Sequence, residues 1–294
     1  MPTSTAMSRL RQALGAQLRR LSARRAPALP RAGFPALAQP TPRLAQLSDA
    51  ELGRLNDLLP WQCFTVDAAG RRFGDRAWAG KREEPQALPD RRIGLLHSLI
   101  GLSGRRVLEI GCFEGVHTIA LCERAGQVIA VDARVENVVK TLVRCHFYGQ
   151  APDVRRCDVE SADDLATLGE VDVVHHVGVL YHLVDPVAHL RQLAALTRVG
   201  MMLDTHVARP SEAQAEYDSG GRRYAYRKLK ESGVSDAFSG MYDHAKWLTV
   251  DALVGLLREL GFASVTVHEQ RDERNGLRIL LFAQRSTSPN ESSG

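Results

Sequence analysis

The sequence predicts an α/β fold in which helices cover both faces of a mostly parallel, seven-stranded sheet. From residue 106 onward, short apolar stretches typical of strands alternate with longer stretches of helical periodicity. Helix ends are well marked, since Asp185 suits an N-cap and Pro186 a first helical position. The chain closes with two consecutive strand patterns joined by the turn-rich DERNG, which makes the last strand antiparallel.

The individual elements follow from these patterns in chain order. We expect strands at 106–111, 127–132, 154–158, 171–178, 199–205, 262–269 and 276–284. We expect helices at 116–126, from 133 through Cys145, at 186–199 with Gly200 closing the far end, and from Thr249 to Gly261. In the last helix, four leucines are expected to face inward: Leu253, Leu256, Leu257 and Leu260.

The net charge of +4 is unevenly distributed along the 294 residues. Residues 1–46 contain eight arginines and no acid, which leaves 30 basic against 34 acidic residues in 47–294. A protein that lies along nucleic acid usually carries its positive charge on the folded body, and this one does not.

The basic segment is expected to be a largely disordered tail. It has a Pro-rich linker at 26–42 and an N-terminal helical extension, because 7–21 can form a basic amphipathic helix. A membrane-surface helix, a partner helix and an organelle transit peptide are the alternatives. The ordered protein is then expected to begin near Leu47, with a cap segment at 47–90, the main domain at 91–285 and a disordered end at 286–294.

Five cysteines, odd in number and without paired spacing, favour reduced thiols in a cytoplasmic protein: Cys63, Cys112, Cys122, Cys145 and Cys157. No apolar run approaches the roughly 18 residues that a membrane helix needs. No pattern in the sequence specifies an oligomeric state.

The stretch VLEIGCFEG (107–115) predicts a cofactor loop. A strand that runs into a glycine-rich turn and then a helix offers backbone N–H groups to a polar ligand. Asp132 ends the second strand, 21 residues after Gly111, where an acid can accept both ribose hydroxyl protons. The alternative is a tight strand–helix turn with a capping aspartate.

The details of the loop favour a cofactor without phosphate. Dinucleotide loops carry G-x-G-x-x-G, whereas here Phe113 and Glu114 would crowd and repel a pyrophosphate. S-adenosylmethionine is cationic and has no phosphate, so Glu109 just before the turn suits it. Asp158, after the third strand, can accept from an adenine amino group, or else cap the helix that begins near Ser161. The ring of Phe113 is expected to pack beside the cofactor or the N-terminal segment.

These motifs resemble those of the class I S-adenosylmethionine-dependent methyltransferases. The resemblance covers about residues 90–285 and rests on E-x-G-x-x-x-G (109–115), VDA (131–133), CD (157–158) and the closing hairpin. GVLYH (178–182) followed by D-P and a helix, with LLPWQCF (58–64), resembles the family containing tRNA wobble-uridine carboxymethyltransferases and many uncharacterised small-molecule relatives. The resemblance implies a Rossmann-like seven-stranded methyltransferase sheet with an antiparallel last strand, and S-adenosyl-L-methionine as cofactor.

The resemblance also implies roles for individual residues. Glu109 and Gly111 would contact the methionine part, Asp132 the ribose, and Asp158 with Val159 the adenine. The pocket where cofactor meets acceptor would be lined by Val177, Gly178 and Tyr181. The loop positions Cys112, Phe113, Gly115, Ala133 and Arg134 complete the expected cofactor-binding set. Gln62 and Cys63 follow Trp61 where a carboxylate-binding lysine is expected, which favours plain methyl transfer.

The acceptor side carries several histidines. A hydroxyl acceptor gains from a general base, and bases in such sheets gather at the carboxyl ends of strands. Candidates there are His182, Asp204, His206 and His244, and we expect Tyr181, His182 and His206 to be catalytic; the alternative for each histidine is a structural role. His175 and His176 point to opposite faces of a strand and are expected to pack. No spacing supports a metal site formed by Asp204, His206 and His182, so no metal is predicted.

A polar insertion at 207–246 is expected to act as a substrate lid, with Gly220, Gly221, Gly233 and Gly240 available as hinges. Within it, RRYAYRKLK (222–230) combines five cations with two tyrosines. This mixture suits nucleic acid, a small anionic substrate, or a solvated helix with a tyrosine face. Four residues are expected on the substrate side: Tyr224, Tyr226, His244 and Trp61.

The sequence therefore predicts an S-adenosylmethionine-dependent methyltransferase that acts on a small molecule or glycan. A tRNA-modifying methyl- or carboxymethyltransferase is the alternative, favoured by GVLYH and the basic stretch in the insertion. A cofactor-binding scaffold without catalytic activity is a third hypothesis.

Overall fold

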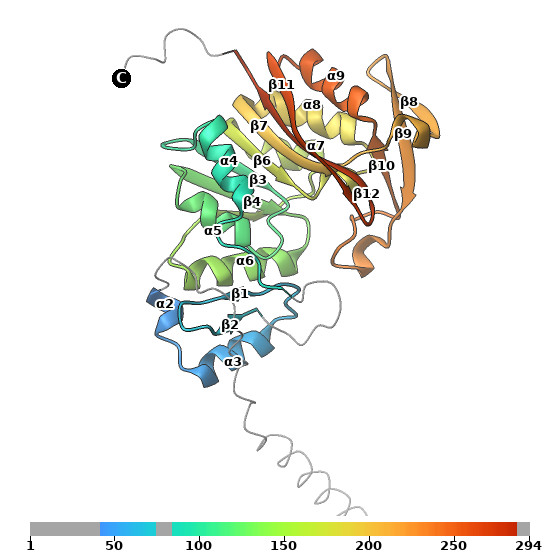
Figure 1. The fold of residues 1–294 in the computed structure, drawn as a ribbon. Helices are drawn as coiled ribbons and strands as arrows, with labels where there is room; N and C mark the ends of the chain where they lie inside the picture. The colour runs from blue at the N-terminus through green and yellow to red at the C-terminus, as the bar shows by residue number, and fades with distance from the viewer. Residues whose placement is uncertain (1–41, 75–83, 287–294) are drawn as a thin grey trace, which may run out of the picture.

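The computed structural model describes residues 42–74 and 84–286, and its centre is a seven-stranded sheet (Figure 1). The strand order is β11-β12-β7-β6-β3-β4-β5. The strands are β3 (Arg106–Ile110), β4 (Gln127–Asp132), β5 (Asp153–Arg156), β6 (Val171–Val177), β7 (Thr197–His206), β11 (Ser264–Glu273) and β12 (Gly276–Gln284). Within this sheet β12 alone runs opposite to the other strands, which confirms the predicted mostly parallel sheet with an antiparallel last strand.

Helices cover both faces of the sheet because each face is apolar (Figure 1). They are α4 (Arg91–Leu99), α5 (Val116–Cys122), α6 (Val135–Phe147), α7 (Ala162–Ala166), α8 (Pro186–Leu196) and α9 (Val250–Glu259). The predicted leucine face of α9 packs into the core cluster that also includes the inner side of α8. On the other face, Ile93 and Leu96 of α4 pack with Val107 and Val173 of the sheet.

The expected end of α8 at Gly200 is wrong. The helix stops at Leu196, and Gly200 lies inside β7, opposite Gln284 of β12. A Cβ at residue 200 would come within 2.6 Å of the Ala283 carbonyl oxygen. The glycine therefore serves a close approach of two strands, and the helix ends where Thr197 adopts an extended backbone.

The insertion forms a second, three-stranded antiparallel sheet of β8 (Ala215–Ser219), β9 (Arg222–Lys230) and β10 (His244–Leu248). The basic stretch 222–230 is thus a strand, and the helix considered for it is wrong. Residues 231–243 connect β9 to β10, and we call this segment the lid loop. Figure 1 shows it extending from the small sheet toward the carboxyl ends of the central strands.

The N-terminal cap consists of α2 (Pro42–Ala45), α3 (Asp49–Leu58) and the hairpin of β1 (Thr65–Val66) and β2 (Arg72–Phe73). Leu44, Trp61 and Phe73 pack with Ile119 and Tyr148 in a core cluster of their own, so the cap is anchored to α5 and α6. Ordered structure therefore includes residues just before the expected start at Leu47. The predictions for the tail, the helix at 7–21, most of the linker and the end of the chain after residue 286 lie outside the described residues.

Within the described part of the chain, no helix has both the length and the apolar character needed to span a bilayer. All five cysteines are free thiols. The cytoplasmic location expected from them stays a prediction.

Candidate active site

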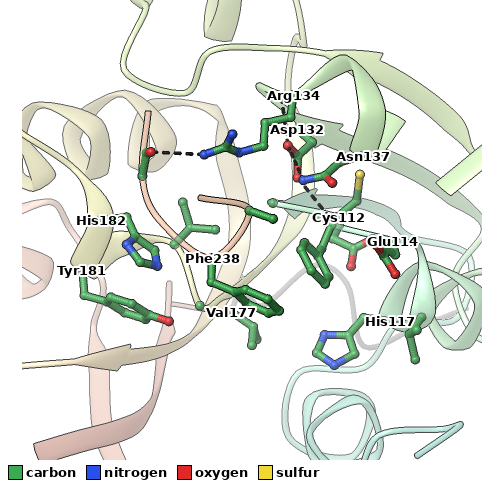
Figure 2. Close-up of a pocket in the computed structure, with 18 of the residues that line it drawn as sticks. Cys112, Glu114, His117, Asp132, Arg134, Asn137, Val177, Tyr181, His182 and Phe238 are labelled. Carbon is green, nitrogen blue, oxygen red and sulfur yellow. Dashed lines mark hydrogen bonds between the residues drawn. The ribbon is translucent and has the colours of Figure 1, made fainter. Parts of the chain in front are cut away.

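A cavity of about 780 Å³ opens at the carboxyl ends of β3, β4 and β6 (Figure 2). Its lining includes the glycine loop after β3, the segments that follow β4, β5 and β6, the lid loop, residues 86–92 and the hairpin of β11 and β12. Pockets for small ligands typically measure about 300–1,000 Å³, so this cavity has room for a cofactor together with a small acceptor.

The glycine loop has the backbone that its sequence predicts. Gly111 has a φ of +72°, and a Cβ there would lie 2.3 Å from Cγ2 of Val179 in the turn after β6. Phe113 also has a positive φ, 50°, and its N–H donates to Asp132 Oδ2 at 3.0 Å. Its ring packs against Phe238 of the lid loop, with 5.6 Å between the ring centroids. Phe113 therefore connects the loop to the lid.

Gly115 lies behind the loop, outside the described lining of the cavity, as the N-terminal residue of α5. A Cβ there would come within 3.0 Å of Thr141 Cα in α6. Gly115 therefore lets α5 approach α6, and the expected contact of Gly115 with the cofactor stays a prediction.

Asp132 is oriented by three hydrogen bonds. Besides the Phe113 amide, its carboxylate accepts from the Arg134 amide at 2.9 Å and from Asn137 Nδ2 at 3.1 Å. Burial raises its pKa nonetheless. Sequence reasoning missed Asn137, which lies one helical turn into α6 and lines the cavity.

Glu109 and Asp158 are the other two acids on this side of the cavity. Glu109 is buried and accepts from Thr118 Oγ1 at 2.6 Å, and burial raises its pKa to about 7. Asp158 accepts from the Glu160 amide at 3.1 Å and from the hydroxyl of Tyr242 at 3.3 Å. Ser161 caps α7, so the capping alternative for Asp158 is wrong. Three carboxylates therefore face one half of the cavity.

Arg134 does not place its charge in that half. Its guanidinium donates to five backbone carbonyls of the lid loop, at distances of 2.8–3.3 Å: those of Gly233, Val234, Asp236, Ser239 and Gly240. Figure 2 shows the side chain reaching from the end of β4 toward the lid. The residue was predicted from its loop position, but this contact could not be predicted, because the acceptors are about 100 residues away.

Glu114 has a different role from the one expected. Its carboxylate is fully buried and accepts from the Gln62 amide at 2.7 Å, the Cys63 amide at 3.0 Å and Lys140 Nζ at 2.8 Å. Arg144 lies 3.7 Å away. The charge of Glu114 is therefore compensated and attaches the N-terminal cap to the glycine loop, so it would not repel a ligand phosphate.

Tyr181 and His182 form the opposite side of the cavity, in a short 3₁₀ turn (Leu180–His182) after β6. Their ring centroids are 4.2 Å apart, and the guanidinium of Arg278 lies 5.5 Å from the centre of the Tyr181 ring. His182 Nδ1 is 2.9 Å from Glu231 Oε1 at the start of the lid loop. In Figure 2 the ring of Phe238 lies between this pair and His117.

An acid–arginine network borders the cavity from Tyr181, which Arg278 contacts, to His117, which Arg92 contacts. It joins four arginines to four acids: Arg91, Arg92, Arg271 and Arg278 to Asp90, Asp204, Glu269 and Glu273. Asp204 is fully buried at its centre; burial would raise its pKa, but the guanidiniums of Arg278 and Arg92 hold the pKa below its usual value. Asp204 is therefore a poor base, and its carboxylate is engaged by three arginines: Arg92, Arg271 and Arg278.

His206 is not on the cavity surface in the described structure. Its ring stacks on Trp247 with 4.8 Å between centroids, and Nδ1 lies 3.3 Å from the Leu277 carbonyl oxygen. Burial lowers its pKa. Its ring also contacts that of Tyr181, with 4.8 Å between the centroids, so this position favours a structural role, and a catalytic role for His206 stays a prediction.

The four residues expected on the substrate side also lie outside the described cavity lining. Trp61 is buried in the cap against Phe73. Tyr224 is buried and Tyr226 packs on the same core cluster. His244 pairs with Asp243 on β10. Of the insertion, the lid loop alone lines the cavity, through residues 237–241.

His117 lines the cavity, and three further histidines are buried: His175, His176 and His189. Glu109, His117 and His175 have potential ligand atoms within 4.8 Å of one another, and among the residues that the structure describes neither ring nitrogen of buried His175 has a hydrogen-bond partner. His176 contacts His189, with 2.9 Å between their Nε2 atoms. Both expected packing histidines are buried, and the absence of a metal stays a prediction.

The sheet with one antiparallel strand, and a glycine loop below an acid-lined cavity, define a class I S-adenosylmethionine-dependent methyltransferase. The chain belongs to the family whose model is described as methyltransferase domain, which matches residues 74–267. Its cofactor is S-adenosylmethionine.

Named relatives and solved structures give the same class. The chain is 31% identical to the tRNA U34 carboxymethyltransferase of Alteromonas mediterranea, over 80% of this chain and 64% of that protein. It is 26% identical to the ubiquinone biosynthesis O-methyltransferase of Cereibacter sphaeroides, over 58% of this chain and 65% of that protein. The chain thus spans less than two thirds of the length of these relatives.

Among solved structures, the N-terminal domain of EvdMO1 in the presence of SAH and D-fucose matches with a TM-score of 0.63. It is 25% identical, and the match covers 79% of this chain and 94% of that chain.

Proposed function

We propose that this protein transfers a methyl group from S-adenosylmethionine to a hydroxyl of a small molecule or glycan. The observation that carries the proposal is that different parts of one cavity have different lining. Glu109, Asp132 and Asp158 line the part at the carboxyl ends of β3, β4 and β5, whereas Tyr181 and His182 line the part at the turn after β6, beside Arg278 of the charge-balanced acid–arginine network. A cationic cofactor fits the first part, the cofactor half, and an uncharged polar acceptor fits the second, the acceptor half.

The residues of the first half fit the cofactor by their chemistry. Oδ1 of Asp132 accepts from Arg134 and Asn137, and Oδ2 accepts from Phe113, which leaves a lone pair of Oδ2 for a ribose hydroxyl. Asp158 and Val159 would receive the adenine, with Ala133 between the two sites. Glu109, Gly111 and Cys112 would hold the methionine part, where the acid favours the ammonium group. The cofactor supplies a sulfonium methyl group, and its sulfur keeps the electron pair when the carbon–sulfur bond breaks.

The second half favours a polar, uncharged acceptor. Its four arginines are balanced by four acids, so it offers donors and acceptors for hydroxyl groups without a net charge. Tyr181 and Val177 add apolar surface for the carbon skeleton of the acceptor. The D-fucose named with EvdMO1 and the O-methylation named for the ubiquinone relative support this class of acceptor.

The second candidate function is tRNA modification, which the Alteromonas relative favours. The ion pairs of the basic strand β9 weigh against tRNA modification. Arg222 pairs with Glu259 and Arg227 with Glu212, so part of the positive charge of the strand is already neutralised. Its tyrosines pack on the core, so they are not available to stack on bases. The absence of a lysine at Gln62 or Cys63 further favours methyl over carboxymethyl transfer.

The test is to incubate the purified chain with methyl-labelled S-adenosylmethionine and separate panels of acceptors. D-fucose represents neutral sugars, catechol represents phenols, and bulk tRNA represents nucleic acid. We expect label in a sugar or phenol, and we expect Asp132→Asn to abolish it. Label in tRNA, together with tRNA binding that weakens steeply with salt, would replace the proposal by the second candidate. If no fraction acquires label, the cofactor-binding scaffold without catalytic activity becomes the remaining hypothesis.

A further inference from the structure

The side chain of His182 is oriented by an acid from another part of the chain. Glu231 follows β9, 49 residues after His182, and its Oε1 lies 2.9 Å from His182 Nδ1. Both side chains are mostly buried, with exposed fractions of 17% for His182 and 12% for Glu231. Nδ1 is thus occupied by a carboxylate, and no hydrogen-bond partner for Nε2 is found in residues 42–74 and 84–286. His182 itself lines the cavity.

Glu231 is in turn held in place by the lid loop. Its Oε2 accepts from Ser239 Oγ at 2.5 Å and from the Gly240 amide at 3.3 Å. Burial would raise the pKa of Glu231, but the hydrogen bonds from His182 and Ser239 hold the pKa below its usual value, so the residue is an anion. Gly240 packs directly against His182, because a Cβ at 240 would lie 2.5 Å from the His182 carbonyl oxygen.

The same lid residues are attached to the cofactor half. Arg134 donates to the carbonyls of Ser239 and Gly240, and its own amide donates to the carboxylate of Asp132. A chain of contacts therefore runs from Asp132 through Arg134 and the lid loop to Glu231 and His182. With the lid loop in this position, the His182–Glu231 pair is complete.

We propose that Glu231 is the positioning residue for a general base, His182, and that closure of the lid loop assembles the pair. This inference rests on the proposed function, because it requires a hydroxyl acceptor. A carboxylate at Nδ1 keeps the proton there and leaves Nε2 as the acceptor atom. The oxygen–hydrogen bond of the acceptor breaks, its proton passes to Nε2, and the imidazolium later releases the proton to water. The oxygen lone pair is then available for the new bond to carbon.

The first experiment needs no acceptor. Nitrogen-15 NMR of the histidine side chains, assigned with His182→Asn, reports which ring nitrogen carries the proton in the full chain with SAH bound. We expect the Nδ1–H form in the wild type. In Glu231→Gln the amide NH₂ can donate to Nδ1, so we expect the proton to move to Nε2. A wild-type ring protonated at Nε2 alone, or the same form in both proteins, would overturn the inference.

The second experiment is kinetic and uses the panel member that the wild type methylates. General bases typically contribute about 10²–10⁴-fold, so we expect Glu231→Gln to lower kcat about 100-fold with KM for S-adenosylmethionine within about twofold. Glu231→Asp keeps the carboxylate and should recover part of the rate. The matched control is Glu216→Gln, an exposed acid of the same insertion that pairs with Arg223, which should match the wild type.

The two proposals fail in different ways. A wild type that labels no sugar or phenol refutes the proposed function, while the NMR result still decides whether Glu231 sets the proton position. If the wild type is active and Glu231→Gln has a kcat within threefold of the wild-type value, only the role proposed for Glu231 is refuted.

Discussion

Glu114 offers the sharpest test of how the cap is attached to the cofactor loop. Its fully buried carboxylate accepts two backbone N–H groups and the ammonium of Lys140. In Glu114→Gln, either orientation of the amide places its NH₂ group against a backbone donor. The substitution also leaves Lys140 and Arg144, with exposed side-chain fractions of 4% and 0%, without their anionic partner.

Breaking a buried ion pair from one side typically costs about 3–5 kcal/mol, because the remaining charge stays buried. We expect a loss of this size in the free energy of unfolding, measured by urea titration, and a much smaller loss for the exposed control Glu136→Gln. Adding Lys140→Met to Glu114→Gln should restore part of the loss, since the uncompensated ammonium is removed. A Glu114→Gln protein within 1 kcal/mol of the wild type would refute the reasoning.

Three further predictions follow from the cavity. Gly111→Ala adds backbone strain of roughly 1–2 kcal/mol and places a Cβ 2.3 Å from Val179 Cγ2, so calorimetry should show at least about tenfold weaker binding of S-adenosylmethionine. The control Gly149→Ala has a similar φ and no described atom within 4 Å of its Cβ, so it should bind the cofactor as the wild type does. Burial raises the pKa of Glu109 from 4.5 to about 7, so its protonated form stabilises the fold at low pH and this stability is lost as pH rises through 7. The Tm of cofactor-free Glu109→Gln minus that of the wild type should therefore be larger at pH 8 than at pH 5. The same Tm difference at both pH values would contradict this. Arg134→Gln should speed amide hydrogen exchange in 231–243, whereas a change at exposed Arg156, Arg156→Gln, should not.

The cofactor half could be predicted from sequence because its signals are local. Glu109, Gly111 and Asp132 lie at strand ends, and parallel strands bring their carboxyl ends to one edge of the sheet. The seven-stranded sheet with its antiparallel last strand followed from the alternation of elements and the closing hairpin in the same way.

The contacts of the acceptor half could not be predicted from the sequence, because they join segments that are distant along the chain. Asp204 meets Arg278 from 74 residues away, and Glu231 meets His182 from 49 residues away. Glu114 was misinterpreted for the same reason, since its partners are amides of the cap more than 50 residues earlier. No local pattern distinguishes these acids from exposed ones.

One error had a signal in the sequence. Tyr224 and Tyr226 are two residues apart, which places both side chains on one face of a strand. The structure buries that face on the core and leaves the arginines outside. Recognising this alternation would have favoured a strand over a helix and removed both tyrosines from the expected substrate site.

Calorimetric titration of the full chain with S-adenosylmethionine, beside Asp132→Asn, tests the central claim most directly. Hydrogen bonds to a charged group contribute about 1.5–3 kcal/mol, and 1.4 kcal/mol is tenfold in affinity. We predict one binding site per chain in the wild type and at least tenfold weaker binding in Asp132→Asn, with an unchanged circular dichroism spectrum. A wild type that shows no binding, or a variant that binds equally well, would contradict the assignment of this cavity to the cofactor.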